Sequence, residues 1–148
     1  MKKWLVILSA GAFLLLGGCS SLDDVNSTLT YANEATDYVN EASDFAKEVP
    51  SLAEQAVSDQ QAAEELEKKL KEMKKDIESF NELQPPDMAA ELHQQIIDQN
   101  NKVIEGIDLY LDNIKDGKLD PRILENTEIF QSIQEITSII DQIKKLGQ

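Results

Sequence analysis

Apolar and small side chains recur at intervals of three and four residues along four stretches of this chain, at about 22–49, 59–83, 88–116 and 121–146. This spacing places the side chains on one face of an α-helix. No stretch shows the alternation of apolar and polar residues, bounded by hairpin turns, that is typical of strands. Four amphipathic helices with short connections predict an all-α protein, an antiparallel four-helix bundle of up-down-up-down topology. Alternatively, the apolar seam of the second helix pairs with another copy of the chain.

The first stretch carries a row of aromatic and alanine residues, Tyr31, Ala35, Tyr38, Ala42 and Phe45. Such a row can be a recognition stripe, but the alanines would let a neighbouring helix approach the rings, which favours core. Pro50 is expected to end this helix, because the residue before a proline is displaced from the α region.

The start of the second helix is left open by two capping boxes, Ser51 with Glu54 and Ser58 with Gln61. From about residue 59 a near-heptad apolar seam runs to Phe80. The outer face alternates glutamate and lysine four residues apart, which indicates a solvated surface rather than a docking site. Pro85 and Pro86 end the helix.

Polar and special residues mark the boundaries of the last two helices. Asp87 is expected to cap the third helix, and Gly117 to follow its last residue. Gly106 lies inside that helix and predicts close packing against a neighbour. Asp120, followed by Pro121, is expected to cap the fourth helix. An interruption at 126–127 is a further possibility for the fourth helix.

The segment before these helices has the layout of a signal peptide. Lys2 and Lys3 precede an apolar run from Trp4 to Leu16, and the small residues Gly17 and Gly18 precede Cys19. The run has 13 residues. A helix of that length spans about 20 Å, which is less than the hydrocarbon core of about 30 Å. A permanent transmembrane anchor is therefore disfavoured.

The sequence Leu16-Gly17-Gly18-Cys19 resembles the lipobox of small lipoproteins of the Bacillus-type cell envelope. The resemblance implies cleavage between Gly18 and Cys19 and attachment of a diacylglycerol to the Cys19 thiol. It divides the chain into a removed signal peptide (1–18), a lipidated tether (19–21) and one helical domain (22–148). It also implies a location on the extracytoplasmic face of the cell membrane. The alternative is an uncleaved or secreted chain in which the cysteine occurs by chance.

The charge of the chain limits its partners. The chain has 28 acidic and 14 basic residues, and loss of residues 1–18 removes Lys2 and Lys3 and leaves a formal charge of −16. Nucleic acid is excluded as a partner, since binding it requires clustered lysine and arginine. Anionic headgroups repel the domain, so lipid on Cys19 is expected to provide the membrane attachment. The acidity also motivates an alternative function, binding of divalent cations at the membrane surface.

No catalytic or metal-binding pattern is recognisable. The one histidine, His93, is expected at the surface or its boundary, because its helical neighbours include no second ligand: Ala89, Ala90, Ile96 and Ile97. Residues 112–120 fail as a calcium loop because Ile114 and Ile123 stand where oxygen ligands are needed. We therefore predict a non-enzymatic binding or structural module of the cell envelope, with no cofactor and an unidentified envelope protein as partner. A bundle-core pocket for a small apolar ligand is a further alternative.

Overall fold

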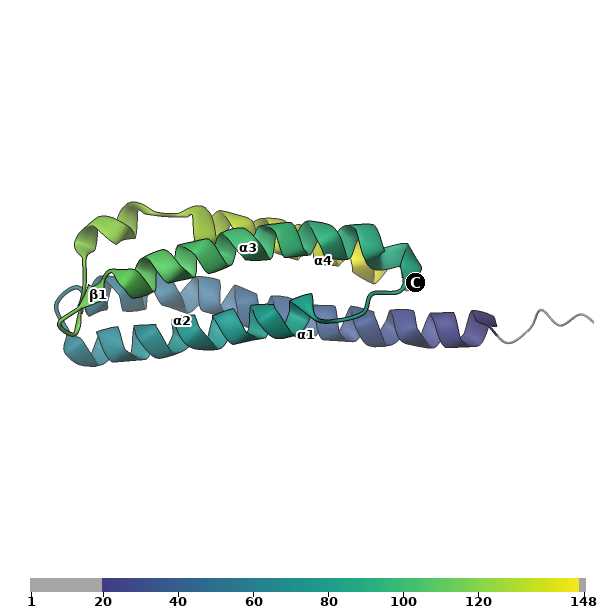
Figure 1. Cartoon of the computed structure of the whole chain (residues 1–148), viewed down its shortest axis with the longest axis horizontal. Coiled ribbons are helices and arrows are strands. Elements are labelled where there is room, and N and C mark those ends of the chain that lie inside the picture. Colours follow the sequence, from purple (N-terminus) through teal and green to yellow (C-terminus); the bar gives the residue numbers. More distant parts are fainter. Residues whose placement is uncertain (1–19, 147–148) are drawn as a thin grey trace, which may run out of the picture.

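The computed structural model describes the backbone of residues 20–146 and the side chains of residues 26–146. Four helices form an elongated antiparallel bundle: α1 (Ser20–Ala56), α2 (Gln60–Asn81), α3 (Ala90–Asp112) and α4 (Glu128–Leu146). Figure 1 shows that each helix runs opposite to the one before it. The predicted all-α bundle is confirmed. None of these helices is long and apolar enough to cross a membrane. Leu16, Gly17, Gly18 and Cys19 lie outside the described residues.

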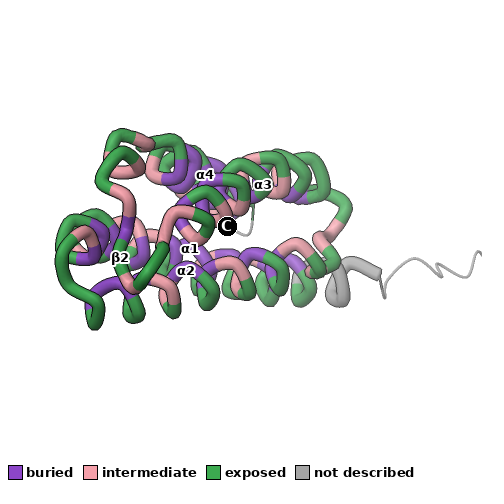
Figure 2. The backbone as a smooth tube through the Cα atoms, turned by 60° about the vertical axis from the view of Figure 1, so that its left-hand side comes forward, coloured by how far each residue is buried: buried purple, intermediate pink, exposed green. Residues whose placement is uncertain are grey.

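The core runs along the centre of the bundle, where α1 packs against α2 and α4, and α3 packs against α2 and α4. Buried positions face inward on all four helices (Figure 2). The aromatic and alanine row of α1 is part of this core, as predicted. The apolar seam of α2 is also buried within the chain, at Ala63, Leu66, Leu70, Met73, Ile77 and Phe80. Within the described residues, this seam therefore packs against the chain's own helices.

The prediction that Pro50 ends the first helix is wrong, because α1 continues through Pro50 to Ala56. Proline removes one helical hydrogen bond and strains the preceding turn. Here Pro50 is exposed, while Val49, Ala53 and Ala56, on the inward-facing side of the helix, are completely buried. Burial of this continued apolar face offsets the local cost of the proline.

Neither predicted capping box begins the second helix. The N-cap of α2 is Asp59, whose Oδ1 accepts hydrogen bonds from the backbone N–H groups of Gln61 at 2.8 Å and Ala62 at 3.1 Å. Asp87 does not cap α3 either. It is the first residue of a short 3-10 helix, η1 (Asp87–Ala89), which has no side-chain cap. The fixed φ of Pro86 sets the entry to this segment instead.

The expectation of no strands is wrong for one small hairpin at the far end of α3. Strand β1 (Ile114–Lys115) pairs antiparallel with β2 (Lys118–Leu119). The turn residues Asp116 and Gly117 have φ values of 53° and 73°, as in the Asp-Gly turns that match the twist of a two-residue hairpin. Gly117 therefore serves a hairpin turn and not the end of a helix, since α3 already ends at Asp112.

The fourth helical stretch is interrupted at residues 126–127, the possible break noted in the sequence. Asp120 caps a 3-10 helix, η2 (Pro121–Glu125), by accepting a hydrogen bond from the N–H of Arg122 at 3.0 Å. The chain then breaks at residues 126–127, and α4 begins at Glu128. The Asn126 side chain accepts from the Glu128 N–H at 3.2 Å, which restarts the helix.

The close approach predicted at Gly106 is confirmed, and it yields a testable prediction. A Cβ added to Gly106 would lie 2.2 Å from Cγ1 of Ile129, a completely buried side chain on α4. We expect Gly106→Ala to lower the free energy of unfolding by about 2 kcal/mol, because overpacking outweighs the gain in helix propensity. Thermal and urea unfolding measure this effect. Gly106→Ala/Ile129→Ala, which removes the clashing Cγ1, should be destabilised by less than the sum of the two single variants. An unchanged or raised stability of Gly106→Ala would contradict the packing seen here.

Candidate functional site

A strongly charged concave surface of the described chain lies between α1 and α2. Its central part has a volume of about 260 Å³, and an adjoining part of about 230 Å³ shares Glu41 and Asp76 with it. We call this surface the acidic groove. Its carboxylates come from both helices: Glu34, Asp37, Glu41, Asp44 and Glu48 from α1, and Glu72 and Asp76 from α2.

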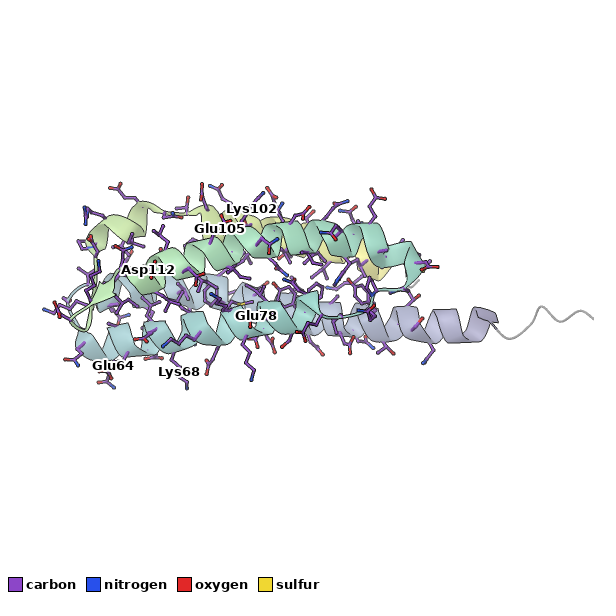
Figure 3. The ribbon with its side chains drawn as sticks, in the orientation of Figure 1. Glu64, Lys68, Glu78, Lys102, Glu105 and Asp112 are labelled. Carbon is purple, nitrogen blue, oxygen red and sulfur yellow. The ribbon has the colours of Figure 1, made fainter. Side chains whose placement is uncertain are left out.

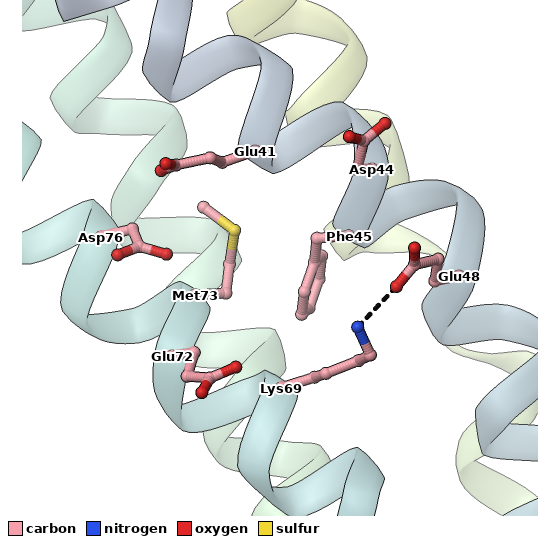
Figure 4. Close-up of a pocket in the computed structure, with 8 residues that line it drawn as sticks. All are labelled: Glu41, Asp44, Phe45, Glu48, Lys69, Glu72, Met73 and Asp76. Carbon is pink, nitrogen blue, oxygen red and sulfur yellow. Dashed lines mark hydrogen bonds and ion pairs between the residues drawn. The ribbon is translucent and has the colours of Figure 1, made fainter.

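Helical periodicity explains why so many carboxylates line one groove. On α1 they follow one another at intervals of three and four residues, which places them along a single edge of the helix. The floor between the two edges consists of nearly buried side chains, Tyr38, Phe45, Met73 and Phe80. Figure 4 shows the carboxylates of both helices arranged around Phe45 and Met73.

One lysine occupies the groove. The Nζ of Lys69 lies 2.5 Å from Oε2 of Glu48 (Figure 4), and this hydrogen bond raises the pKa of the lysine. Asp44 and Glu72 form exposed ion pairs with lysines on their own helices. Among the described residues, no lysine or arginine forms an ion pair with Glu34, Asp37, Glu41 or Asp76. Negative charge in this part of the groove is therefore poorly compensated.

The pKa values of two groove carboxyls are raised as a result. For Glu41 the main cause is desolvation, followed by repulsion from Asp76 and Asp37. For Asp76 the main cause is again desolvation, followed by repulsion from Glu72, and attraction to Lys75 partly offsets both. The ionised groove thus opposes folding at neutral pH. No three of the described histidine, cysteine, aspartate and glutamate side chains are grouped so as to hold a metal ion.

This electrostatic cost can be tested through the pH dependence of stability. A carboxyl whose pKa is raised by folding destabilises the protein when it is ionised, and the loss disappears as pH falls below the ordinary carboxyl pKa. We expect Asp76→Asn to unfold at a higher temperature than the wild type at neutral pH, and the difference to shrink towards about pH 4. Thermal unfolding of both proteins across this range measures it. Glu105→Gln, an exposed substitution on α3, is the control, and an Asp76→Asn protein that is less stable at neutral pH would contradict the electrostatic argument.

A second cluster of polar side chains is buried in the half of the bundle where the chain enters α1. The hydroxyl of Tyr31 is 2.7 Å from Nδ1 of His93. Seven residues further along both helices, the Tyr38 hydroxyl donates to Oδ1 of Asn100. Nδ2 of Asn100 in turn donates to Oδ1 of Asn81 at 2.7 Å. We call these five residues the buried polar network, and it links α1, α2 and α3.

Aromatic rings fill the space around this network. The ring of Phe80 stacks on Tyr38 with centroids 4.4 Å apart and lies 5.2 Å from the ring of His93. The alanines beside the tyrosines, Ala35 and Ala42, are completely buried. The large side chains beside these alanines therefore pack against one another along this part of the core.

The expectation that His93 lies at the surface or its boundary is wrong, since its exposed fraction is 5%. Desolvation lowers its pKa, and an interaction with the Asn81 backbone partly offsets that effect. Desolvation likewise raises the pKa values of Tyr31 and Tyr38. No buried side-chain nitrogen or oxygen in the described part of the chain lacks a hydrogen-bond partner. The network is thus satisfied internally, as expected of polar groups that fix the alignment of helices.

A signal for this network was present in the sequence. His93 and Asn100 fall in register with Ile96, Val103 and Ile107 at intervals of three and four residues, which are seam positions of α3. Polar residues at seam positions need buried partners. The seven-residue spacing of Tyr31 and Tyr38 on α1 matches the spacing of His93 and Asn100. Only the fold reveals that α1 and α3, which run in the same direction across the bundle, bring the two pairs together.

Comparison with known proteins places this chain in a family. Residues 31–146 match the model of DUF6376, described as a family of unknown function. A protein of Bacillus subtilis (strain 168) named "Uncharacterized lipoprotein YybP" is 40% identical over 148 residues, which cover the whole of both chains. No solved structure matches the chain. The resemblance to Bacillus-type lipoproteins, first indicated by Leu16 to Cys19, is confirmed by this relative. The chain therefore belongs to the DUF6376 family of unknown function.

Proposed function

We propose that this protein is an extracytoplasmic lipoprotein, attached to the cell membrane by lipid on Cys19, which binds a cationic partner in the cell envelope without catalysing a reaction. The signal-peptide layout of residues 1–18 and the lipoprotein relative support the anchor. In this proposal Leu16, Gly17 and Gly18 direct cleavage before Cys19. Helix α1 begins at Ser20, so the bundle follows the lipid without an intervening loop.

A binding role is favoured over catalysis by the chemistry of the polar groups. In the buried polar network His93 is hydrogen-bonded to Tyr31. Tyr38 donates to Asn100, and the ring of Phe80 packs against both Tyr38 and His93. The carboxylates outside the core are mostly solvated, and charged side chains point outward around the bundle (Figure 3). General acid–base catalysis instead needs titratable groups held where a substrate can reach them.

The observation that carries the proposal is the poorly compensated negative charge around Glu41 and Asp76 in the acidic groove. Glu41 and Asp76 repel one another across a floor of apolar side chains. A partner that brings ammonium or guanidinium groups removes this repulsion, and its aliphatic stems can cover the floor. The carboxylates extend from Glu34 to Glu48, about 20 Å along α1 at the helical rise per residue. A lysine- or arginine-rich protein segment has the length and charge to match this row.

Binding of a short oligolysine peptide to the purified full chain tests the proposal. We expect Glu41→Gln/Asp76→Asn to weaken binding by about tenfold, since each lost charge contact near a surface is worth up to about 1 kcal/mol. Added salt should weaken binding to the wild type more than to the variant. The matched control is Glu105→Gln/Asp112→Asn, which removes two exposed charges from α3 outside the groove.

Equal affinity of the groove variant and the control variant would contradict a groove-specific partner and leave only general attraction to an acidic protein. Spermine is included to separate a peptide-length partner from a small polyamine. Calorimetry with calcium, magnesium and zinc distinguishes the divalent-cation alternative, which requires heats larger than those of matched monovalent salt.

A further inference from the structure

Large apolar side chains are exposed unevenly along the bundle. Among the described residues, three of the four lie at the end where α1 begins: Leu29 on α1 (47% exposed), Met88 in η1 (56%) and Leu146 at the end of α4 (38%). The fourth, Leu109 (37%), lies near the opposite end of the bundle, close to the hairpin. Figure 1 shows the α2–α3 connection and the end of α4 together at the first of these ends. We call Leu29, Met88 and Leu146 the proximal patch.

The proximal patch is also the part of the bundle nearest to Cys19. Helix α1 extends beyond the other helices at this end (Figure 1). The Thr28 hydroxyl lies 3.4 Å from the sulfur of Met88. Thr28 is therefore level with the end of the bundle formed by the α2–α3 connection. Eight residues separate Ser20 from Thr28, a rise of about 12 Å in a helix. With no loop between Cys19 and α1, a lipid on Cys19 would hold this end close to the bilayer.

We infer that the proximal patch rests on the phospholipid surface, so that the bundle is tilted towards the membrane instead of standing upright on α1. This inference rests on the proposed lipid anchor. An upright bundle would hold Met88 about 12 Å above Ser20, the first residue of α1. A single attachment at Cys19 does not fix the angle of α1, and tilting brings the exposed side chains of three segments down to the headgroups.

The anchor makes such a weak contact effective. Three partly exposed apolar side chains would not hold a free protein on a bilayer. A protein already attached to that bilayer meets its surface at a very high effective concentration, so a small gain suffices to set its orientation. At the same end Lys145 favours anionic headgroups, whereas Asp87 and Glu91 oppose them. Lys144 is already paired with Asp141, at 3.5 Å. The apolar residues are therefore the groups that decide the contact.

Tryptophan scanning with brominated lipids tests the inference. Trp4 is the only tryptophan in the chain, so Trp4→Phe gives a background without tryptophan fluorescence. The full chain is produced in a bacterial host and reconstituted in vesicles of phosphatidylcholine and phosphatidylglycerol, with or without bromine on the acyl chains. We expect brominated lipid to quench Leu29→Trp and Met88→Trp strongly. The matched control, Leu109→Trp, should lose almost no fluorescence.

Two measurements distinguish failure of this inference from failure of the proposed lipid anchor and of the proposed groove binding. Flotation of the vesicles reports the anchor: a chain that does not float with the lipid overturns the anchor and this inference with it. A chain that floats, but in which Met88→Trp is quenched no more than Leu109→Trp, overturns the inference alone. A blue-shifted Met88→Trp spectrum without bromine quenching indicates a protein contact, such as a second copy, and also overturns it. Oligolysine binding to the groove is unaffected by any of these outcomes.

Discussion

Replacing Cys19 by alanine is expected to abolish labelling of the protein with palmitate and to release any chain that has lost residues 1–18 from the membrane. Two acyl chains give stable attachment, whereas one gives only marginal and reversible binding. Little else would hold the domain at the bilayer. None of the described helices is long and apolar enough to cross it, and loss of residues 1–18 leaves a charge of −16 that anionic lipid repels. Metabolic labelling with palmitate and detergent phase partitioning measure the change.

Ser20→Ala is the matched control for this experiment, because it changes the adjacent residue and keeps the thiol. It should retain both the label and the membrane fraction. Intact mass separates release of a processed chain from retention of an uncleaved one, in which the apolar run from Trp4 to Leu16 still provides a membrane contact. Palmitate labelling that persists in Cys19→Ala would refute lipidation at this residue.

Replacing Asn100 by alanine is expected to lower the free energy of unfolding by about 3 kcal/mol. Asn100 is completely buried, accepts a hydrogen bond from Tyr38 and donates one to Asn81. Each buried polar group left without a partner costs about 1–3 kcal/mol, and the space left by the side chain adds to the loss. Urea unfolding measures the change. Asn101→Ala, an exposed neighbour on the same helix, should change stability by less than about 0.5 kcal/mol.

A double-mutant cycle tests whether Tyr38 and Asn100 act as a pair. Tyr38→Phe leaves Oδ1 of Asn100 without its donor, so the single variants should each be destabilised and their effects should not add. Tyr38→Phe/Asn100→Leu replaces both polar groups by apolar ones and should recover part of the loss. Additive effects would mean that the hydrogen bond contributes little, and that packing alone accounts for the cost.

Only one side of the acidic groove, the row of carboxylates on α1, can be predicted from the sequence. The carboxylates of α1 stand at intervals of three and four residues, so their alignment along one edge could have been read directly. Their position opposite Glu72 and Asp76 could not be, because it depends on the rotation of α2 against α1. The glutamate and lysine pattern of α2 predicts a solvated face. Most of it is solvated, but Lys69 reaches across to Glu48 on α1.

The class of fold, the place of the core on each helix and the resemblance to lipoproteins could be predicted from the sequence, and the interruption before α4 could be named as a possible break. These features follow from local periodicity and from motifs whose residues are adjacent in the chain. Three features could not be predicted without the packing of the helices: α1 continues through Pro50, His93 is buried beside Tyr31, and two rows of carboxylates face one another. Each of these outcomes depends on contacts between residues distant in sequence, whose burial energy outweighs the local preference of a proline, a histidine or a charged side chain.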